Sequence, residues 1–103
     1  MEKNLLKSLQ LLKQKYQTKG FFIVGVFGSH ARDENTPASD LDILYRVDKK
    51  FLDSFTGWQA ISELERIKKE IAQNLKITKV DLAPQDNPSK TFQENIKNEL
   101  VYV

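Results

Sequence analysis

Three aspartates in two apolar segments are the residues of this sequence best suited to chemistry. Asp40 and Asp42 flank a single leucine where one apolar segment begins, and Asp81 lies inside another. Alternate residues of a strand share a face and lie about 6.6 Å apart, at about 3.3 Å per residue. The carboxylates of Asp40 and Asp42 are therefore able to converge on one hard cation or on two, and magnesium prefers such oxygen ligands. Two alternatives without a metal stay open. Repulsion within an aspartate pair at a solvated strand end costs about 1 kcal/mol or less, so the pair needs no cation. Asp81 is also able to pair with water or with a lysine.

A glycine–serine turn follows the apolar stretch FFIVGVF at Gly28 and Ser29. A strand that turns at glycine directly into a helical stretch leaves backbone N–H groups free. These groups, with the helix dipole and the serine hydroxyl, form an anion site. Arg32 follows three residues after Ser29, shares that face on a helical turn and is placed to reach the same anion. A plain turn without a ligand is the alternative, because Gly-Ser turns are common.

The combination of these features is more specific than any one of them. Ten residues separate Ser29 from Asp40, and Asp81 approaches the aspartate pair if its strand lies beside theirs. An anion-binding turn, a carboxylate pair and a third carboxylate are suited to metal-assisted transfer of a nucleotidyl group. Such a transfer depends on positioning and charge neutralisation, and it needs no side-chain nucleophile.

The segments around these residues predict an α/β domain. Strands are expected in the most apolar stretches, at 21–27, 40–47 and 76–84. Helices are expected where apolar residues recur at helical spacing or where a cap begins a segment, at 3–18, 58–74 and 88–99. Only 12 residues join the first two strands, which is short for a parallel crossover. We therefore expect a small, mixed, twisted β-sheet backed by α-helices, with 51–56 ambiguous and 101–103 unassigned.

Several residues receive specific structural roles from these patterns. The first strand is expected to be covered on both faces, since it is continuously apolar. Asn87 is expected to cap the last helix, with Pro88 at its first position. The apolar face of the first helix, which Gly20 is expected to terminate, comprises Leu5, Leu9, Leu12 and Tyr16. The apolar face of the second comprises Ile61, Leu64, Ile67 (or Lys68) and Ile71.

Composition and charge narrow the classes of protein. The chain has 103 residues, 40% of them hydrophobic and 29% charged, as expected for one globular domain spanning 1–103. No apolar run approaches the roughly 20 residues of a membrane span, and the N-terminus does not resemble a signal peptide. The absence of cysteine excludes disulfides and thiolate metal sites and fits a cytoplasmic location. The first 20 residues hold five lysines against one glutamate, but no aromatic residues are interleaved with basic ones, so we do not expect direct nucleic-acid binding.

The motif residues resemble a known family. Gly28-Ser29-His30-Ala31-Arg32, followed by a loop and Ser39-Asp40-Leu41-Asp42-Ile43, is similar to the GSxARG…SDxDL signature of the DNA-polymerase-β-like nucleotidyltransferase superfamily. The small size, the Val80-Asp81-Leu82 segment and the tail from Ile96 to Val103 resemble its minimal nucleotidyltransferase branch, the MntA-like antitoxins. The resemblance implies the nucleotidyltransferase fold.

The resemblance also implies an activity and its residues. Gly28, Ser29, Arg32 and Ser39 would bind the nucleotide, ATP. Asp40, Asp42 and Asp81 would be catalytic and would hold two Mg2+ ions. An acceptor hydroxyl would then attack the α-phosphorus, and pyrophosphate would leave. MntA-like proteins are antitoxins encoded beside HEPN-domain toxins, and members transfer AMP to a toxin tyrosine, so a HEPN-type toxin is the expected partner.

One departure from the signature keeps alternatives open. Asp33 occupies the position of the usual glycine, and a negative charge near a triphosphate would weaken nucleotide binding. A catalytically weak or inactive antitoxin that neutralises its toxin by binding is therefore the alternative function. Transfer of a nucleotide to a small molecule or to RNA is less favoured, because relatives with those activities generally carry extra domains. The sequence leaves the acceptor, the base preference and homo-oligomer formation open.

Overall fold

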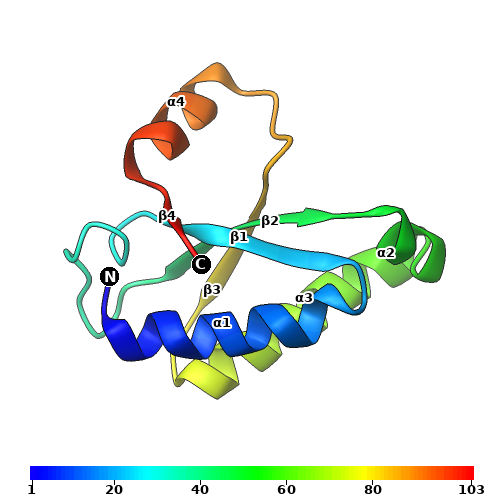
Figure 1. Cartoon of the computed structure of the whole chain (residues 1–103), viewed down its shortest axis with the longest axis horizontal. Helices are drawn as coiled ribbons and strands as arrows, with labels where there is room; N and C mark the ends of the chain where they lie inside the picture. The colour runs from blue at the N-terminus through cyan, green and yellow to red at the C-terminus, as the bar shows by residue number, and fades with distance from the viewer.

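The computed structural model describes all 103 residues. The chain forms one four-stranded mixed sheet (Figure 1). The strands lie in the order β3 (Val80–Pro84), β2 (Leu41–Val47), β1 (Phe21–Phe27) and β4 (Val101–Tyr102). β1 is antiparallel to both β2 and β4, whereas β2 and β3 are parallel. The predicted mixed sheet is confirmed, and the short link between β1 and β2 makes them an antiparallel pair.

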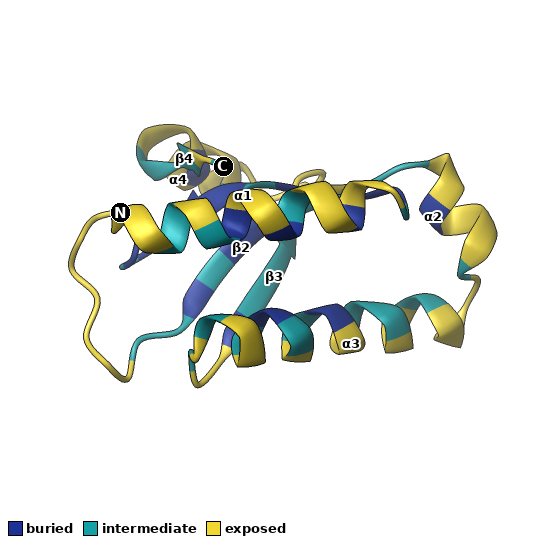
Figure 2. Ribbon diagram, turned by 60° about the horizontal axis from the view of Figure 1, so that its bottom comes forward, coloured by how far each residue is buried: buried dark blue, intermediate teal, exposed yellow.

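Two long helices cover one face of the sheet. They are α1 (Lys3–Gln17) and α3 (Trp58–Leu75), and Figure 2 shows their buried residues turned toward the strands. α1 begins where the Glu2 carboxylate accepts hydrogen bonds from the first free backbone N–H groups, at 2.8 and 2.9 Å. None of the helices has the length and apolar content needed to span a membrane.

The hydrophobic core lies between these helices and the sheet. It also takes in Phe51 of the short helix α2 (Lys49–Ser54). The other core residues are Leu9, Leu12, Tyr16, Phe21, Ile23, Val26, Leu41, Ile43, Ile67, Ile71 and Val80. A fully buried side chain of this kind stabilises the fold by about 1.5–3 kcal/mol, so this face supplies most of the hydrophobic stabilisation.

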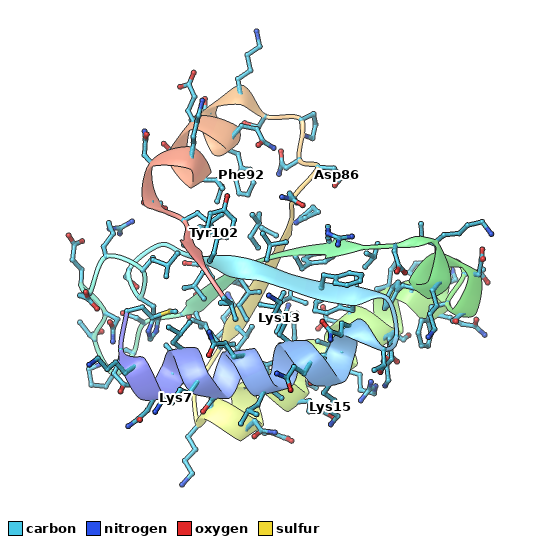
Figure 3. The ribbon with its side chains drawn as sticks, in the orientation of Figure 1. Lys7, Lys13, Lys15, Asp86, Phe92 and Tyr102 are labelled. Carbon is cyan, nitrogen blue, oxygen red and sulfur yellow. The ribbon has the colours of Figure 1, made fainter.

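The opposite face of the sheet is covered only in part, by α4 (Lys90–Glu99) (Figure 1). One residue of α4, Ile96, is buried. The ring of Phe92 packs edge to face on that of Phe27 of β1, with the ring centroids 5.8 Å apart. A cavity of about 490 Å³ lies between α4 and the sheet, above Leu44. Phe92 and Tyr102, labelled in Figure 3, line this cavity from α4 and β4.

The structure corrects some of the predicted boundaries. β3 begins at Val80 instead of 76, because Lys76 adopts φ +55 and caps the C-terminus of α3. α4 begins after Ser89, whose hydroxyl caps the helix, whereas Asn87 accepts a hydrogen bond from the Ser89 N–H in the preceding turn. The ambiguous segment forms α2, capped by Asp48.

Two expectations about burial were also wrong. Ile61 was assigned to the apolar face of α3, but it is 52% exposed, because the face that packs on the core runs through Ala60 and Leu64 and leaves Ile61 beside it. β1 was expected to be covered on both faces, but alternate residues are only half-buried, because α4 covers little of the second face.

Candidate functional site

The three aspartates come from neighbouring strands at one end of the sheet. Asp42 of β2 is paired in register with Asp81 of β3, and Asp40 lies two residues before Asp42. Residues in register on neighbouring strands point to the same side, about 4.8 Å apart. Leu41 and Ile43 are fully buried in the core, so Asp42 and Asp81 lie on the opposite face, which α1 and α3 do not cover. The structure thus brings Asp81 beside the aspartate pair.

An ammonium group lies between two of these carboxylates. Lys79 Nζ is 3.7 Å from Asp40 Oδ2 and 3.7 Å from Asp81 Oδ1. The structure contains no group of three or more His, Cys, Asp or Glu side chains that could hold a metal ion. Carboxylate oxygens are the ligands that Mg2+ prefers, so the donor set suits magnesium, although in this arrangement Lys79 supplies the positive charge.

Of the three carboxylates, that of Asp42 has its negative charge least compensated by neighbouring cations. Burial raises its pKa, and the neighbouring charges of Asp81, Asp40 and Glu99 raise it further, while His30 acts in the opposite direction. No lysine or arginine forms an ion pair with it. A divalent cation would relieve this repulsion, because it would neutralise negative charges that share a partly buried position.

Gly28 joins the predicted phosphate turn, which begins with Gly28 and Ser29 and includes Arg32, to the carboxylates. Its φ is +77°, a conformation that glycine adopts readily. A Cβ at this position would lie only 2.3 Å from Asp42 Oδ2. Glycine is therefore required both by the backbone conformation and by the close approach of Asp42, and the backbone of the turn lies directly against that carboxylate.

The residues after Gly28 form a series of turns, and the expected helical stretch is absent. The Arg32 N–H donates to the Gly28 carbonyl at 3.2 Å, and the Glu34 N–H donates to the Ser29 carbonyl at 2.9 Å. These turns carry no helix dipole, so the positive potential available to an anion comes from backbone N–H groups and Arg32.

Glu99 occupies these anion-binding groups in the structure. Its Oε1 accepts a hydrogen bond from the Gly28 N–H at 3.1 Å, and its Oε2 accepts one from Arg32 Nη1 at 2.8 Å. Arg32 also donates through Nε to Glu34 at 3.1 Å. No sequence pattern points to Glu99, because it lies 71 residues from Gly28 in a segment whose pairing with β1 no local pattern indicates.

The other signature residues make local contacts. The Ser39 hydroxyl accepts from the Thr36 N–H at 2.8 Å and closes the loop before β2. Asp33 has φ +57°, and its carboxylate lies 2.8 Å from the α-amino group of Met1. His30 is buried, and its Nε2 has no hydrogen-bond partner. The charge of Asp33 is therefore paired with a cation outside the predicted phosphate turn.

The sequence profile of the family described as "Polymerase beta, Nucleotidyltransferase" matches residues 9–103. The chain belongs to this nucleotidyltransferase family. Among its relatives are two proteins of Methanocaldococcus jannaschii named "Putative protein adenylyltransferase MJ1379" and "Putative protein adenylyltransferase MJ0126". Each is 33% identical to this chain, and each alignment covers 96% of this chain and 90% of the relative.

Two solved structures share the nucleotidyltransferase fold. One, described as a "putative minimal nucleotidyltransferase", has a TM-score of 0.66 and 23% identity, and the match covers 97% of this chain and 89% of that chain. The other, described as a "toxin-antitoxin with AMP-PNP", has a TM-score of 0.64 and 15% identity, with 92% and 70% covered. Family and fold agree with the resemblance seen in the Gly28–Arg32 and Ser39–Ile43 motifs, and they assign the chain to a family of transferases.

Proposed function

We propose that this nucleotidyltransferase is a magnesium-dependent protein adenylyltransferase that acts as an antitoxin, transferring AMP from ATP to a HEPN-type toxin. The observation that carries the proposal is the contact between Gly28 and Asp42, with Asp81 in register beside Asp42. This contact joins an anion-binding turn to a carboxylate cluster, which is the combination that nucleotidyl transfer needs. The names of the adenylyltransferase relatives and of the toxin–antitoxin structure support the choice of substrate and partner.

Each group has a role in this proposal. The Gly28 N–H, the Ser29 hydroxyl and Arg32 bind the phosphates of ATP, and Ser39 shapes the loop beside them. Asp40, Asp42 and Asp81 hold Mg2+, two ions in all, which when bound neutralise the phosphates and lower the pKa of the acceptor hydroxyl. The acceptor oxygen bonds to the α-phosphorus as the bond to the leaving pyrophosphate breaks, and the hydroxyl proton passes to a carboxylate or to water. The half-open sheet face leaves room for a protein acceptor.

Label transfer tests this proposal. The purified protein is incubated with magnesium, ATP labelled at the α-phosphate and the toxin encoded beside it. We expect the label on the toxin, and a loss of at least about 100-fold in rate with Asp42→Asn, because a charged ligand of the cation is removed. Asp53→Asn, which changes an exposed carboxylate on α2, is the matched control. Transfer that survives Asp42→Asn would contradict the assignment.

A binding-only antitoxin is the second candidate, and one observation favours it. The protein's own side chains hold both parts of the site, since Lys79 bridges Asp40 and Asp81 while Glu99 binds Gly28 and Arg32. Expression of Asp40→Asn with Asp42→Asn beside the toxin, at matched protein levels, distinguishes the two functions. Growth protection by the double variant supports neutralisation by binding, and loss of protection by a folded, toxin-binding variant supports catalysis.

A further inference from the structure

The carboxylate of Glu99 occupies the groups to which the proposed function assigns the phosphates. It accepts from the Gly28 N–H at 3.1 Å through one oxygen and from Arg32 Nη1 at 2.8 Å through the other. We propose that Glu99 is a built-in competitor of the nucleotide, which holds the phosphate turn closed until a triphosphate displaces it. This inference rests on the proposed function, because it takes the turn to be a triphosphate site.

The chemistry of the contact is that of an anion site. A carboxylate and a phosphate both present negatively charged oxygens to N–H donors, and hydrogen bonds to such oxygens are stronger than neutral ones. Glu99 uses one oxygen for a backbone donor and the other for a guanidinium donor. The same two donors therefore serve either Glu99 or a phosphate group, but not both at full strength.

The position of Glu99 is unfavourable for a carboxylate apart from this contact. Glu99 is the last residue of α4, and the C-terminus of a helix carries a partial negative charge that disfavours an anion. Its charge also acts against Asp42, whose Oδ2 faces the α-carbon of the same glycine. Gly28 and Arg32 thus hold Glu99 in place against two repulsive interactions. Both repulsions on Glu99 are relieved when a triphosphate displaces it.

The packing of α4 allows Glu99 to leave. Its side chain is 24% exposed, so it reaches solvent by rotation without crossing the core. Ile96 and Leu100, on either side of Glu99, line the cavity of about 490 Å³ beneath α4. β4 holds the following residues against β1, where Gly25 admits the Val101 carbonyl. The displaced glutamate therefore moves while the tail strand stays paired.

Calorimetric titration with ATP and with inorganic triphosphate, each with Mg2+, tests the proposal. Glu99→Gln keeps the size of the side chain but removes its charge, so we expect both ligands to bind about tenfold more tightly, which is the effect of losing a charge-assisted contact to the same donors. Glu94→Gln removes an exposed charge from the same helix and should leave affinity unchanged. In an Arg32→Ala background the gain from Glu99→Gln should largely disappear, because the donor that it releases is missing.

The Gly28 amide resonance gives a readout that does not depend on turnover. It should shift in Glu99→Gln and, in the unchanged protein, on addition of triphosphate, whereas Glu94→Gln should leave it in place. Equal or weaker binding by Glu99→Gln, with binding by the unchanged protein intact, overturns the competitor role and leaves the proposed function standing. Absence of binding in every variant overturns both.

Discussion

At the scale of single residues, Gly28 is where the predicted phosphate turn meets the carboxylates. Gly28→Ala would combine two costs, a positive φ and a Cβ placed 2.3 Å from Asp42 Oδ2. Gly57 is a matched control, because it has φ +55° but open space around its Cβ position. We expect Gly57→Ala to lower the free energy of unfolding by about 1–3 kcal/mol, the cost of a sparsely populated backbone conformation alone, and Gly28→Ala to lower it by more. Urea denaturation measures both, and equal losses would contradict the contact.

The sequence predicted part of the arrangement around Gly28. Strand periodicity predicts that Asp40 and Asp42 share a face. The approach of Asp81 depends on whether its strand lies beside theirs, and the register between β2 and β3 does bring Asp42 and Asp81 together. Pairing of Asp81 with a lysine was one of the alternatives, and Lys79 does pair with it, but neither the second contact of Lys79 with Asp40 nor the contacts of Glu99 were predicted. Both depend on side-chain geometry between segments distant in the chain or at a strand end, which no local pattern encodes.

At the scale of elements, α1 and α3 are tied together by Glu70. Its carboxylate accepts from Lys15 Nζ at 2.8 Å and from the Tyr16 hydroxyl. These hydrogen bonds lower the pKa of Glu70 from 4.5 to about 2. Because the folded pKa lies below the unfolded one, the contact contributes its full stability above about pH 4.5 and loses it as pH falls toward about pH 2.

Glu70→Gln should therefore reduce the amount of folding stability that the protein loses as the pH falls into the acid range. We expect the variant to be less stable than the unchanged protein at neutral pH, with the difference shrinking as pH falls from about 4.5 to about 2. Thermal unfolding followed by circular dichroism across this range measures the effect. Glu65→Gln, on an exposed position of the same helix, is the control, and a difference that stays constant with pH would contradict the role of Glu70.

The elements also show where periodicity is informative and where it is not. α1 follows its pattern closely, since it packs on the core through a regular apolar face, and β1 spans the predicted residues Phe21–Phe27, although its second face is covered only in part. The start of β3 was placed too early because Ile77 extends the apolar pattern, yet Lys76 adopts the left-handed conformation that ends α3. β4 has only two residues, and its pairing with β1 comes from the tertiary fold and leaves no local signal.

At the scale of the whole molecule, stability depends on the face covered by α1 and α3. Ile67 is fully buried there, and Ile61 on the same helix is 52% exposed. We expect Ile67→Ala to lower the free energy of unfolding by about 2–5 kcal/mol, because it removes buried methylene groups and leaves a cavity. Ile61→Ala should change it by about 0.5 kcal/mol or less. Guanidinium denaturation tests both, and similar losses at the two positions would contradict this division of the core.

The two faces of the sheet carry different kinds of residue. Leu41 and Ile43 anchor the strand to the helices, while Asp42 between them points to the open face. Substitutions at Leu41 and Ile43 would thus act mainly on folding, whereas a substitution at Asp42 would leave the packing against the helices intact. Leu44 limits this alternation, because it is buried although it shares the face of Asp42. Substitutions confined to the open end of this face are therefore able to change the surface around Asp42 while the fold is preserved.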